Sequence, residues 1–316
     1  MRLRARPGRR GPHPRPGRLG AGPAQRRGRP GQHHRRPDAP RARRAAGQPG
    51  RQPGPRGVQP PRARWPRAAR DRHPRLPRRG GLLRRAAAAV RRRVIAVVGG
   101  HGKTGRAVRA ALTARGVETV ATGRAEWPAL ADAVAGCAAA YLIAPNLHPD
   151  EPAYVAEALD ALRAAGVGRV VYHSVASPYC PAMPHHLGKA VAEDLVRRSG
   201  LAWTVLQPGA YLQNLDLTRD VAVPYDVDAV FGFADRDDVA EVAALVLTET
   251  GHEGATYELA SRTATVAGLA AEAGVRATRT DEQPDGWLGA MFAHYDAHGL
   301  PAGPRTMAGL LGRPGR

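Results

Sequence analysis

The sequence predicts an α/β fold for residues 94–316: a doubly wound parallel sheet with a small, mostly helical C-terminal cap, preceded by a disordered extension. Two observations support this prediction. The composition changes sharply near residue 93, and the chain then alternates short apolar runs with amphipathic helical stretches. Such an alternation is typical of a parallel sheet that carries helices on both faces.

The first 93 residues have a strongly biased composition. They contain 30 Arg, 16 Pro, 14 Ala and 13 Gly, with two acids and one aromatic side chain, for a net charge of +28. A segment with so little apolar surface cannot offset its chain entropy, and its prolines interrupt helices and strands. Residues 1–93 are therefore predicted to be disordered, whereas residues 94–316, with a net charge of −7, are predicted to form one folded domain.

Three explanations remain open for residues 1–93. The arginine runs could bind nucleic acid or another anionic surface. The segment could be a targeting peptide, although it lacks the apolar stretch of a secretory signal. It could also be an artefact of a misplaced start site, because Arg, Gly, Pro and Ala have GC-rich codons. Val90 and Val94 stand where a valine-type start codon would place the N-terminus.

The remaining composition is typical of a soluble protein in a reducing compartment. Cys137 and Cys180 stand in no paired motif, and no stretch approaches the roughly 18 apolar residues of a membrane helix. We therefore predict a cytoplasmic location. No metal site is predicted, because the adjacent His185 and His186 would point about 100° apart on a helix and no cysteine cluster exists.

The folded part opens with a strand, a glycine-rich turn and a helix. Residues 94–98 are a β-branched run that suits a buried parallel strand, and residues 106–115 place an apolar stripe on one face of a helix. Between them lies the turn Gly99-Gly100-His101-Gly102-Lys103-Thr104-Gly105, and residues 117–121 are predicted to form a second strand. This is the context of a dinucleotide-binding turn.

Each glycine of this turn has an expected role. Gly99 allows the tight turn, Gly102 lets the backbone approach the pyrophosphate, and Gly105 lets the helix and strand pack closely. The free N–H groups and the dipole of the helix N-terminus favour phosphates, so all seven residues of the turn are candidate cofactor ligands. A nucleotide-hydrolysing P-loop is excluded, because that motif needs a glycine where Val97 stands.

Arg124 follows the second predicted strand, at the position where NAD enzymes usually carry an acid. A guanidinium there can pair with a 2′-phosphate, so NADP(H) is predicted in preference to NAD(H). The alternative is that Arg124 is a solvated surface cation.

Later elements follow the same alternation. A helix is predicted over residues 127–136, a strand over 139–143, a helix over 152–166 and a strand over 169–173. Ala144 and Pro145 end one of these strands and are candidate cofactor contacts, because loops at strand carboxyl ends line the ligand crevice. Only about 14 residues separate Arg124 from residue 139, so one sheet strand is predicted to be missing or shortened.

Residues 170–214 carry a recognisable pattern: VVYHS, HHLGK, SGL, TVLQP, and an aromatic residue before QN. Together with the opening GGHGKTG, this resembles the NmrA-like branch of the atypical short-chain dehydrogenases/reductases over about residues 94–312. The resemblance implies a Rossmann-type fold, NAD(P) binding and an active site in which Lys189 holds the nicotinamide ribose. It matches Ser174, or less well Ser177, to the upstream serine of these enzymes.

The resemblance has one important departure. Short-chain reductases carry a tyrosine four residues before the lysine, and here that position is His185. His185 could donate the proton in place of the tyrosine, or it could only line the site. Ser174, His185 and Lys189 are the candidate catalytic residues.

Two functions remain open at this point. The chain is expected to be an NADPH-dependent oxidoreductase acting on a small quinone or carbonyl compound, or a non-catalytic NADP(H)-sensing regulatory protein. The small molecule is expected in a crevice beside Pro208, under a cap formed mainly by residues 211–234 and 264–312. Trp287, Met291, Phe292 and Tyr295 are predicted to form one packed helical face in that cap. No membrane partner is expected, nucleic acid could bind only through the basic extension, and two copies could form a homodimer.

Overall fold

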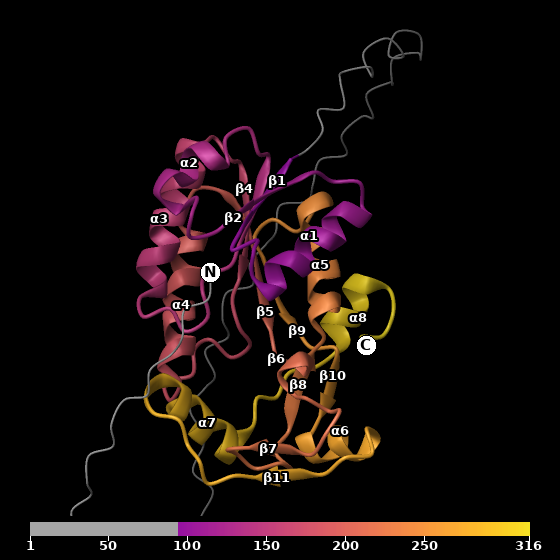
Figure 1. The fold of residues 1–316 in the computed structure, drawn as a ribbon. Helices are drawn as coiled ribbons and strands as arrows, with labels where there is room; N and C mark the ends of the chain where they lie inside the picture. The colour runs from indigo at the N-terminus through magenta and orange to yellow at the C-terminus, as the bar shows by residue number, and fades with distance from the viewer. Residues whose placement is uncertain (1–93) are drawn as a thin grey trace, which may run out of the picture. The chain divides into compact units, whose positions relative to one another are not determined.

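A computed structural model describes residues 94–316, so the predicted disorder of residues 1–93 lies outside the described residues (Figure 1). The main element is a six-stranded sheet in the order β2-β1-β3-β4-β5-β9, in which every neighbouring pair is parallel. Its strands are β1 (Ile95–Val98), β2 (Thr119–Thr122), β3 (Ala139–Leu142), β4 (Arg169–His173), β5 (Ala202–Pro208) and β9 (Ala255–Leu259).

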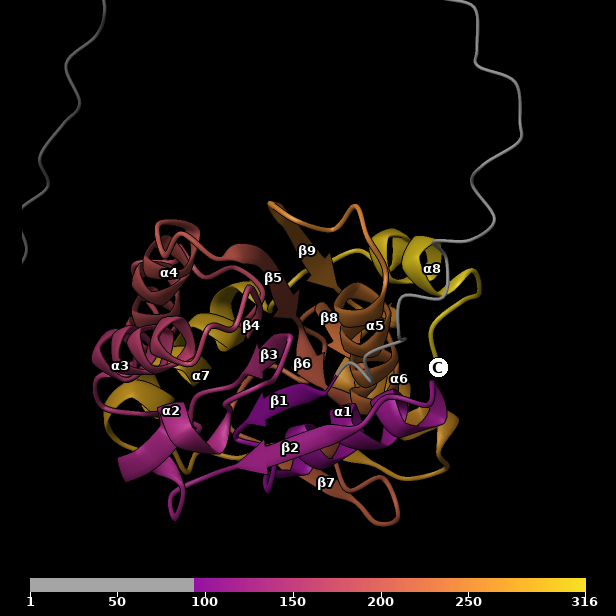
Figure 2. The same ribbon diagram turned by 90° about the horizontal axis from the view of Figure 1, so that it is seen from above.

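Helices cover both faces of this sheet, as Figure 2 shows from above. One face carries α1 and α5, and the other carries α2, α3 and α4. The inner strands β1, β3 and β4 are buried on both sides, which explains why their sequences are continuous apolar runs rather than alternating ones. The helices are α1 (Lys103–Ala114), η1 (Trp127–Ala129), α2 (Leu130–Ala133), α3 (Glu151–Ala164), α4 (Pro184–Arg197) and α5 (Arg236–Thr248).

The strand order indicates where a ligand crevice is expected. The chain runs from β1 outward to β2 and then returns to the other side of β1 as β3, so the direction reverses between β1 and β3. Ligands of such sheets bind at this reversal, outside the carboxyl ends of the strands. Within residues 94–316 no further strand pairs with β2, which agrees with the short connection before residue 139.

Two predicted helix boundaries were wrong. α1 begins at Lys103, three residues before the predicted start, because Gly102 is its N-cap and Gly105 lies inside its first turn. The helix predicted over residues 127–136 is divided into η1 and α2, because the backbone of Ala129, with φ −129 and ψ 39, leaves the helical region.

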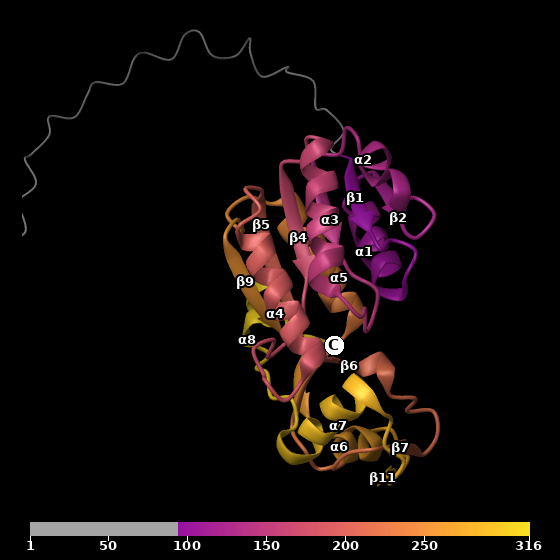
Figure 3. The same cartoon turned by 90° about the vertical axis from the view of Figure 1, so that its left-hand side faces the viewer.

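The cap lies beyond the carboxyl end of the sheet (Figure 3). It has its own apolar core, built around Phe231, Tyr225 and Tyr295, which is separate from the two cores of the sheet. The three-stranded sheet β10-β8-β6 and the two-stranded sheet β11-β7 accompany two helices. Its elements are β6 (Ala210–Tyr211), η2 (Leu212–Asn214), β7 (Val221–Val223), β8 (Phe231–Ala234), β10 (Arg262–Ala264), α6 (Val266–Glu272), β11 (Ala277–Arg279) and α7 (Gly286–His298).

The last helix does not belong to the predicted cap. α8 (Arg305–Leu311) packs on α5 and β9, and Met307 is fully buried in the core of the main sheet. The cap boundary at residue 312 was therefore wrong, because helical periodicity shows that a helix has an apolar face and does not show which partner covers it.

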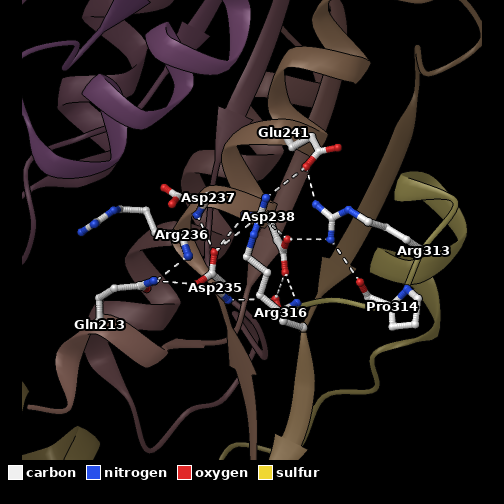
Figure 4. A network of polar contacts seen from close by, with 10 residues as sticks. Gln213, Asp235, Arg236, Asp237, Asp238, Glu241, Arg313, Pro314 and Arg316 are labelled. Carbon is white, nitrogen blue, oxygen red and sulfur yellow. Dashed lines mark hydrogen bonds and ion pairs between the residues drawn. The ribbon is translucent and has the colours of Figure 1, made fainter. Parts of the chain in front are cut away.

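Charged groups fix this C-terminal region to the first turn of α5 (Figure 4). Asp235 caps the helix by accepting hydrogen bonds from the backbone N–H groups of Asp237 and Asp238 at 2.8 and 3.2 Å. The buried Asp238 carboxylate accepts from Ser261 Oγ at 2.7 Å and pairs with Arg313 at 3.0 Å and Arg316 at 2.5 Å. Between residues 94 and 316, every helix is too short or too polar to span a bilayer.

Candidate active site

The glycine turn lies at the reversal point of the sheet and connects three strand ends. Gly99 has a φ of +82°, and its N–H and that of Gly100 donate to the carbonyl of Thr122 at the end of β2 at 2.9 and 3.0 Å. A Cβ on Gly99 would lie 2.6 Å from the carbonyl oxygen of Ile143, directly after β3. The turn therefore lies against Ile143, the residue that precedes Ala144 and Pro145 in the chain.

Gly102 differs from the other glycines of the turn. A Cβ on Gly105 would lie 2.3 Å from the carbonyl oxygen of Gly99, so internal packing requires glycine there. A Cβ on Gly102 would meet nothing closer than 3.4 Å, and its φ of −72° suits any residue. Packing inside the protein therefore does not explain Gly102, whereas close approach of a ligand to its backbone would.

The start of α1 fits a phosphate ligand. No side chain caps this helix, so the N–H groups of its first turn lack a protein acceptor. No acidic residue stands in that turn, and Lys103 and Arg106 add positive charge beside it. A dinucleotide pyrophosphate satisfies these groups, so the residues present fit the predicted cofactor.

Arg124 is exposed two residues after the end of β2. Close to it, the Glu126 carboxylate accepts from the Gly123 N–H at 2.7 Å and lies 3.6 Å from Nε2 of His101. The hydrogen bond from Gly123, followed by the Coulombic effect of His101, lowers the pKa of Glu126. The sequence prediction missed Glu126, although it follows Arg124 by only two residues.

Two candidate residues of α4 share one face of that helix with a buried glutamate. His185, Lys189 and Glu193 follow one another at intervals of four, and all three are buried. Lys189 Nζ lies 2.8 Å from Oε1 of Glu151, the first residue of α3. The same Oε1 accepts a hydrogen bond from the Tyr172 hydroxyl at 2.6 Å. Lys189 is therefore not a surface lysine but half of a buried ion pair.

Ser174 is occupied by a different carboxylate. Its hydroxyl donates to Oε1 of the fully buried Glu193 at 2.5 Å, and Gln207 donates to the same oxygen at 2.7 Å. The other oxygen of Glu193 pairs with Arg197 at 2.8 Å. Ser174 thus contacts α4 at Glu193, one helical turn after Lys189, and Glu193 sets the orientation of the Ser174 hydroxyl.

His185 has a largely apolar setting. Its ring stacks on Trp287 of α7, with centroids 6.5 Å apart, and it makes no side-chain hydrogen bond within residues 94–316. Burial, and then the nearby Lys189 ammonium, lower the pKa of His185, so its imidazole is neutral at neutral pH. Trp287 therefore faces the site, whereas Met291, Phe292 and Tyr295 pack in the cap core as predicted.

A third polar group lies on the opposite face of the sheet, below the glycine turn. The buried His173 is hydrogen-bonded through Nδ1 to the Tyr141 hydroxyl and through Nε2 to the Tyr211 hydroxyl at 3.3 Å. A neutral imidazole has one donor and one acceptor nitrogen, so one tyrosine donates and the other accepts. Burial, and then the Lys189 ammonium, lower the pKa of His173 to about 3.

This pKa predicts a loss of stability in acid. The unfolded chain binds a proton on His173 below pH 6.5, whereas the folded chain does so only near pH 3. The contribution of His173 to the free energy of unfolding is therefore fully present above pH 6.5. It falls as the pH decreases toward 3, by up to about 1.4 kcal/mol per pH unit. Urea unfolding between pH 7 and 4.5 should give a shallower pH slope for His173→Gln than for the wild type. The exposed His298→Gln should keep the wild-type slope; equal slopes for all three proteins would contradict the prediction.

Part of this domain is similar to known NAD(P)H-binding proteins. A family profile described as NAD(P)H-binding matches residues 125–250. An NAD(P)H azoreductase of Xenophilus azovorans is 33% identical over 155 residues, which cover 46% of this chain and 53% of the relative. Quinone oxidoreductase 2 of Escherichia coli strain K12 is 31% identical over 173 residues, which cover 51% of this chain and 59% of the relative.

Solved structures agree with this fold. A crystal structure of a mutant NmrA matches with a TM-score of 0.58 and 20% identity, covering 70% of this chain and 91% of that one. The domain therefore has the fold of these proteins, and residues 125–250 match an NAD(P)H-binding profile. An NADPH-dependent quinone oxidoreductase from Escherichia coli, complexed with NADPH, matches with a TM-score of 0.59 and 24% identity, covering 70% of this chain and 96% of that one. In sequence, the chain spans only 53% of the length of the azoreductase and 59% of the length of quinone oxidoreductase 2.

The predicted Rossmann-type sheet is thereby confirmed, and the resemblance to NmrA-like proteins agrees with the match to the NmrA structure in fold. Sequence reasoning missed Glu151, Glu193 and Tyr172, the buried groups that hold the candidate catalytic residues. Glu151 had a weak local signal, because it follows Asp150, a typical N-cap residue, at a strand carboxyl end. Glu193 had another, because it continues the four-residue spacing of His185 and Lys189.

Proposed function

We propose that this protein is an NADPH-dependent oxidoreductase that reduces a small quinone-like acceptor. The observation that carries the proposal is the open backbone of Gly102 at an uncapped helix N-terminus. The relatives named as an NAD(P)H azoreductase and a quinone oxidoreductase support the choice of acceptor, because both names describe reduction of conjugated compounds.

Different residues of this chain would bind the two ends of the cofactor. The backbone of Gly99–Gly105 would hold the pyrophosphate, and Arg124 the 2′-phosphate. Lys189, Ala144, Pro145 and Pro208 would line the nicotinamide end. NADPH, when bound, supplies the hydride. Trp287 and His185 would face the acceptor from the cap side, where they exclude water.

The neutral His185 is compatible with this reaction. Reducing a quinone to a hydroquinone requires one hydride and one proton. A conjugated acceptor spreads the charge that it receives with the hydride, so it does not need a strong acid from the protein. A simple carbonyl compound would need that acid more, which favours a quinone as the acceptor.

The preference for NADPH can be tested at Arg124. Arg124→Ala is expected to weaken NADPH binding by about tenfold, the scale of one charge-assisted contact, and to leave NADH binding unchanged. Titration of both cofactors by intrinsic fluorescence checks this, with the distant surface variant Arg198→Ala as a control. An equal change for both cofactors would contradict a 2′-phosphate contact.

Turnover distinguishes this proposal from the alternative of a non-catalytic NADP(H) sensor, which the loss of the family tyrosine favours. The full chain should oxidise NADPH only when a quinone such as menadione is added. NADPH binding without acceptor-dependent oxidation, across quinones and azo dyes, would favour the sensor. A homodimer, a cytoplasmic location and the basic extension as a nucleic-acid arm stay predictions from the sequence.

A further inference from the structure

The strongest unexplained feature of the molecule is the second carboxylate oxygen of Glu151. The residue is 2% exposed, and its Oε1 already receives both Lys189 Nζ at 2.8 Å and the Tyr172 hydroxyl at 2.6 Å. Oε2 is equally buried and has no hydrogen-bond partner among residues 94–316. Both available donors thus converge on one oxygen and leave the other without a donor.

Such an arrangement is unfavourable unless something else binds there. A buried carboxylate is normally hydrogen-bonded at both oxygens, because burying an unpaired acceptor costs about 1–3 kcal/mol. In residues 94–316 only three residues besides Glu151 have a buried side-chain polar atom without a partner, and Glu151 alone among the four pairs with a candidate catalytic residue. The orphaned oxygen therefore indicates a ligand that donates a hydrogen bond.

The position of Glu151 identifies the ligand group. Glu151 opens α3 at the carboxyl end of the sheet, on the same side as Lys189, where the nicotinamide half of the cofactor would lie. The groups of a ribose diol are hydroxyls, which need an acceptor as well as a donor. Lys189 offers only donors, and the tyrosine that would supply a hydroxyl is replaced by His185.

We propose that Glu151 binds the nicotinamide ribose directly, with Oε2 accepting a hydrogen bond from one of its hydroxyls while Oε1 keeps Lys189 in place. This inference rests on the proposed cofactor. Oε2 has no contact with solvent, so the ribose reaches it by shifting the side chains packed around it.

Two substitutions separate the ligand role from the structural one. In Glu151→Gln the amide oxygen can still accept from Lys189 and Tyr172, while the second position becomes a donor. Glu151→Asp keeps the negative charge beside Lys189 but withdraws the carboxylate by about one C–C bond, roughly 1.5 Å. Glu157→Gln, an exposed glutamate on the same helix, is the matched control.

Binding of two probes to the full chain gives the readout. Both Glu151 variants should bind NADPH about tenfold more weakly than the wild type, the difference expected for one hydrogen bond to a charged group. Both should bind adenosine 2′,5′-bisphosphate, which lacks the nicotinamide ribose, within twofold of the wild type. Glu157→Gln should match the wild type with both probes.

Either of two results would overturn the assignment. Unchanged NADPH binding in a folded Glu151→Asp would mean that Oε2 meets no ligand, and equal weakening of both probes would mean that Glu151 acts only through the fold. If Glu151→Gln does not fold, Glu151→Asp carries the test, because Lys189 keeps its counter-charge. Failure of the wild type to bind NADPH would instead remove the proposed function itself.

Discussion

Gly102→Ala should lose NADPH binding and keep its fold. The added methyl group would have no protein atom closer than 3.4 Å, so it would point into the space where the pyrophosphate must approach. Overpacking of this kind costs about 1–3 kcal/mol, which corresponds to roughly 10- to 100-fold weaker binding. The stability of the free protein should change by less than about 1 kcal/mol, because φ at this position is −72° and only a glycine cap is lost.

Gly105→Ala is the matched control, because it changes the same turn by the same methyl group. There the Cβ would lie 2.3 Å from the carbonyl oxygen of Gly99 and 2.7 Å from Cα of Gly100. The clash lies inside the protein, so the free energy of unfolding should fall by at least about 1–3 kcal/mol. Thermal melts with and without NADPH measure both effects. Ordinary NADPH binding by Gly102→Ala would show that no ligand approaches this backbone.

The glycine turn could be predicted because its determinants are local. A buried strand, three glycines and a helix follow one another within residues 94–115, so their spacing alone places them at one strand end. The structure adds what spacing cannot contain. Gly99 and Gly105 are required by contacts inside the protein, whereas Gly102 is the glycine that packing leaves unexplained.

The buried polar contacts of Glu151, Lys189, Ser174 and Glu193 could not be predicted in the same way. Glu151 and Lys189 are 38 residues apart, and nothing in either segment indicates the other. Glu151 stands at the end of a loop, where a solvated carboxylate is the ordinary expectation, and its burial depends on how α3 and α4 pack side by side. Ser174 and Glu193 illustrate the same point, since a strand end and a helix interior meet only in the folded sheet.

The cap shows a limit of periodicity. Trp287 and Tyr295 occupy one predicted helical face. Tyr295 is nevertheless buried in the cap core, whereas Trp287 stacks on His185 and keeps 38% of its surface exposed. α8 has a comparable apolar face and covers the main sheet instead. The pattern indicates that a face is covered, and only the tertiary arrangement decides whether the cover is the cap, the sheet or the site.

Lys189→Met should destabilise the protein by about 3–5 kcal/mol, because it leaves the Glu151 carboxylate buried without a counter-charge. Both side chains lie within the protein, with 10% and 2% of their surfaces exposed, so solvent cannot replace the lost partner. Lys103→Met changes the other lysine of the sequence, which lies on the exposed first turn of α1, and it should cost less than about 0.5 kcal/mol. Urea unfolding at pH 7 measures both variants.

The double variant Glu151→Gln/Lys189→Met decides between an ion pair and simple packing. It removes both buried charges at nearly constant volume. Most of the stability lost in Lys189→Met should therefore return, because no unpaired charge stays buried. If the losses of the two single variants simply add, the pair is not coupled and Lys189 stabilises the fold by its aliphatic stem. The same comparison decides how activity data at Lys189 are interpreted. Lost turnover in Lys189→Met alone can come from lost stability, whereas in the double variant, where the fold is restored, it reports on the joint absence of the ammonium and the Glu151 carboxylate.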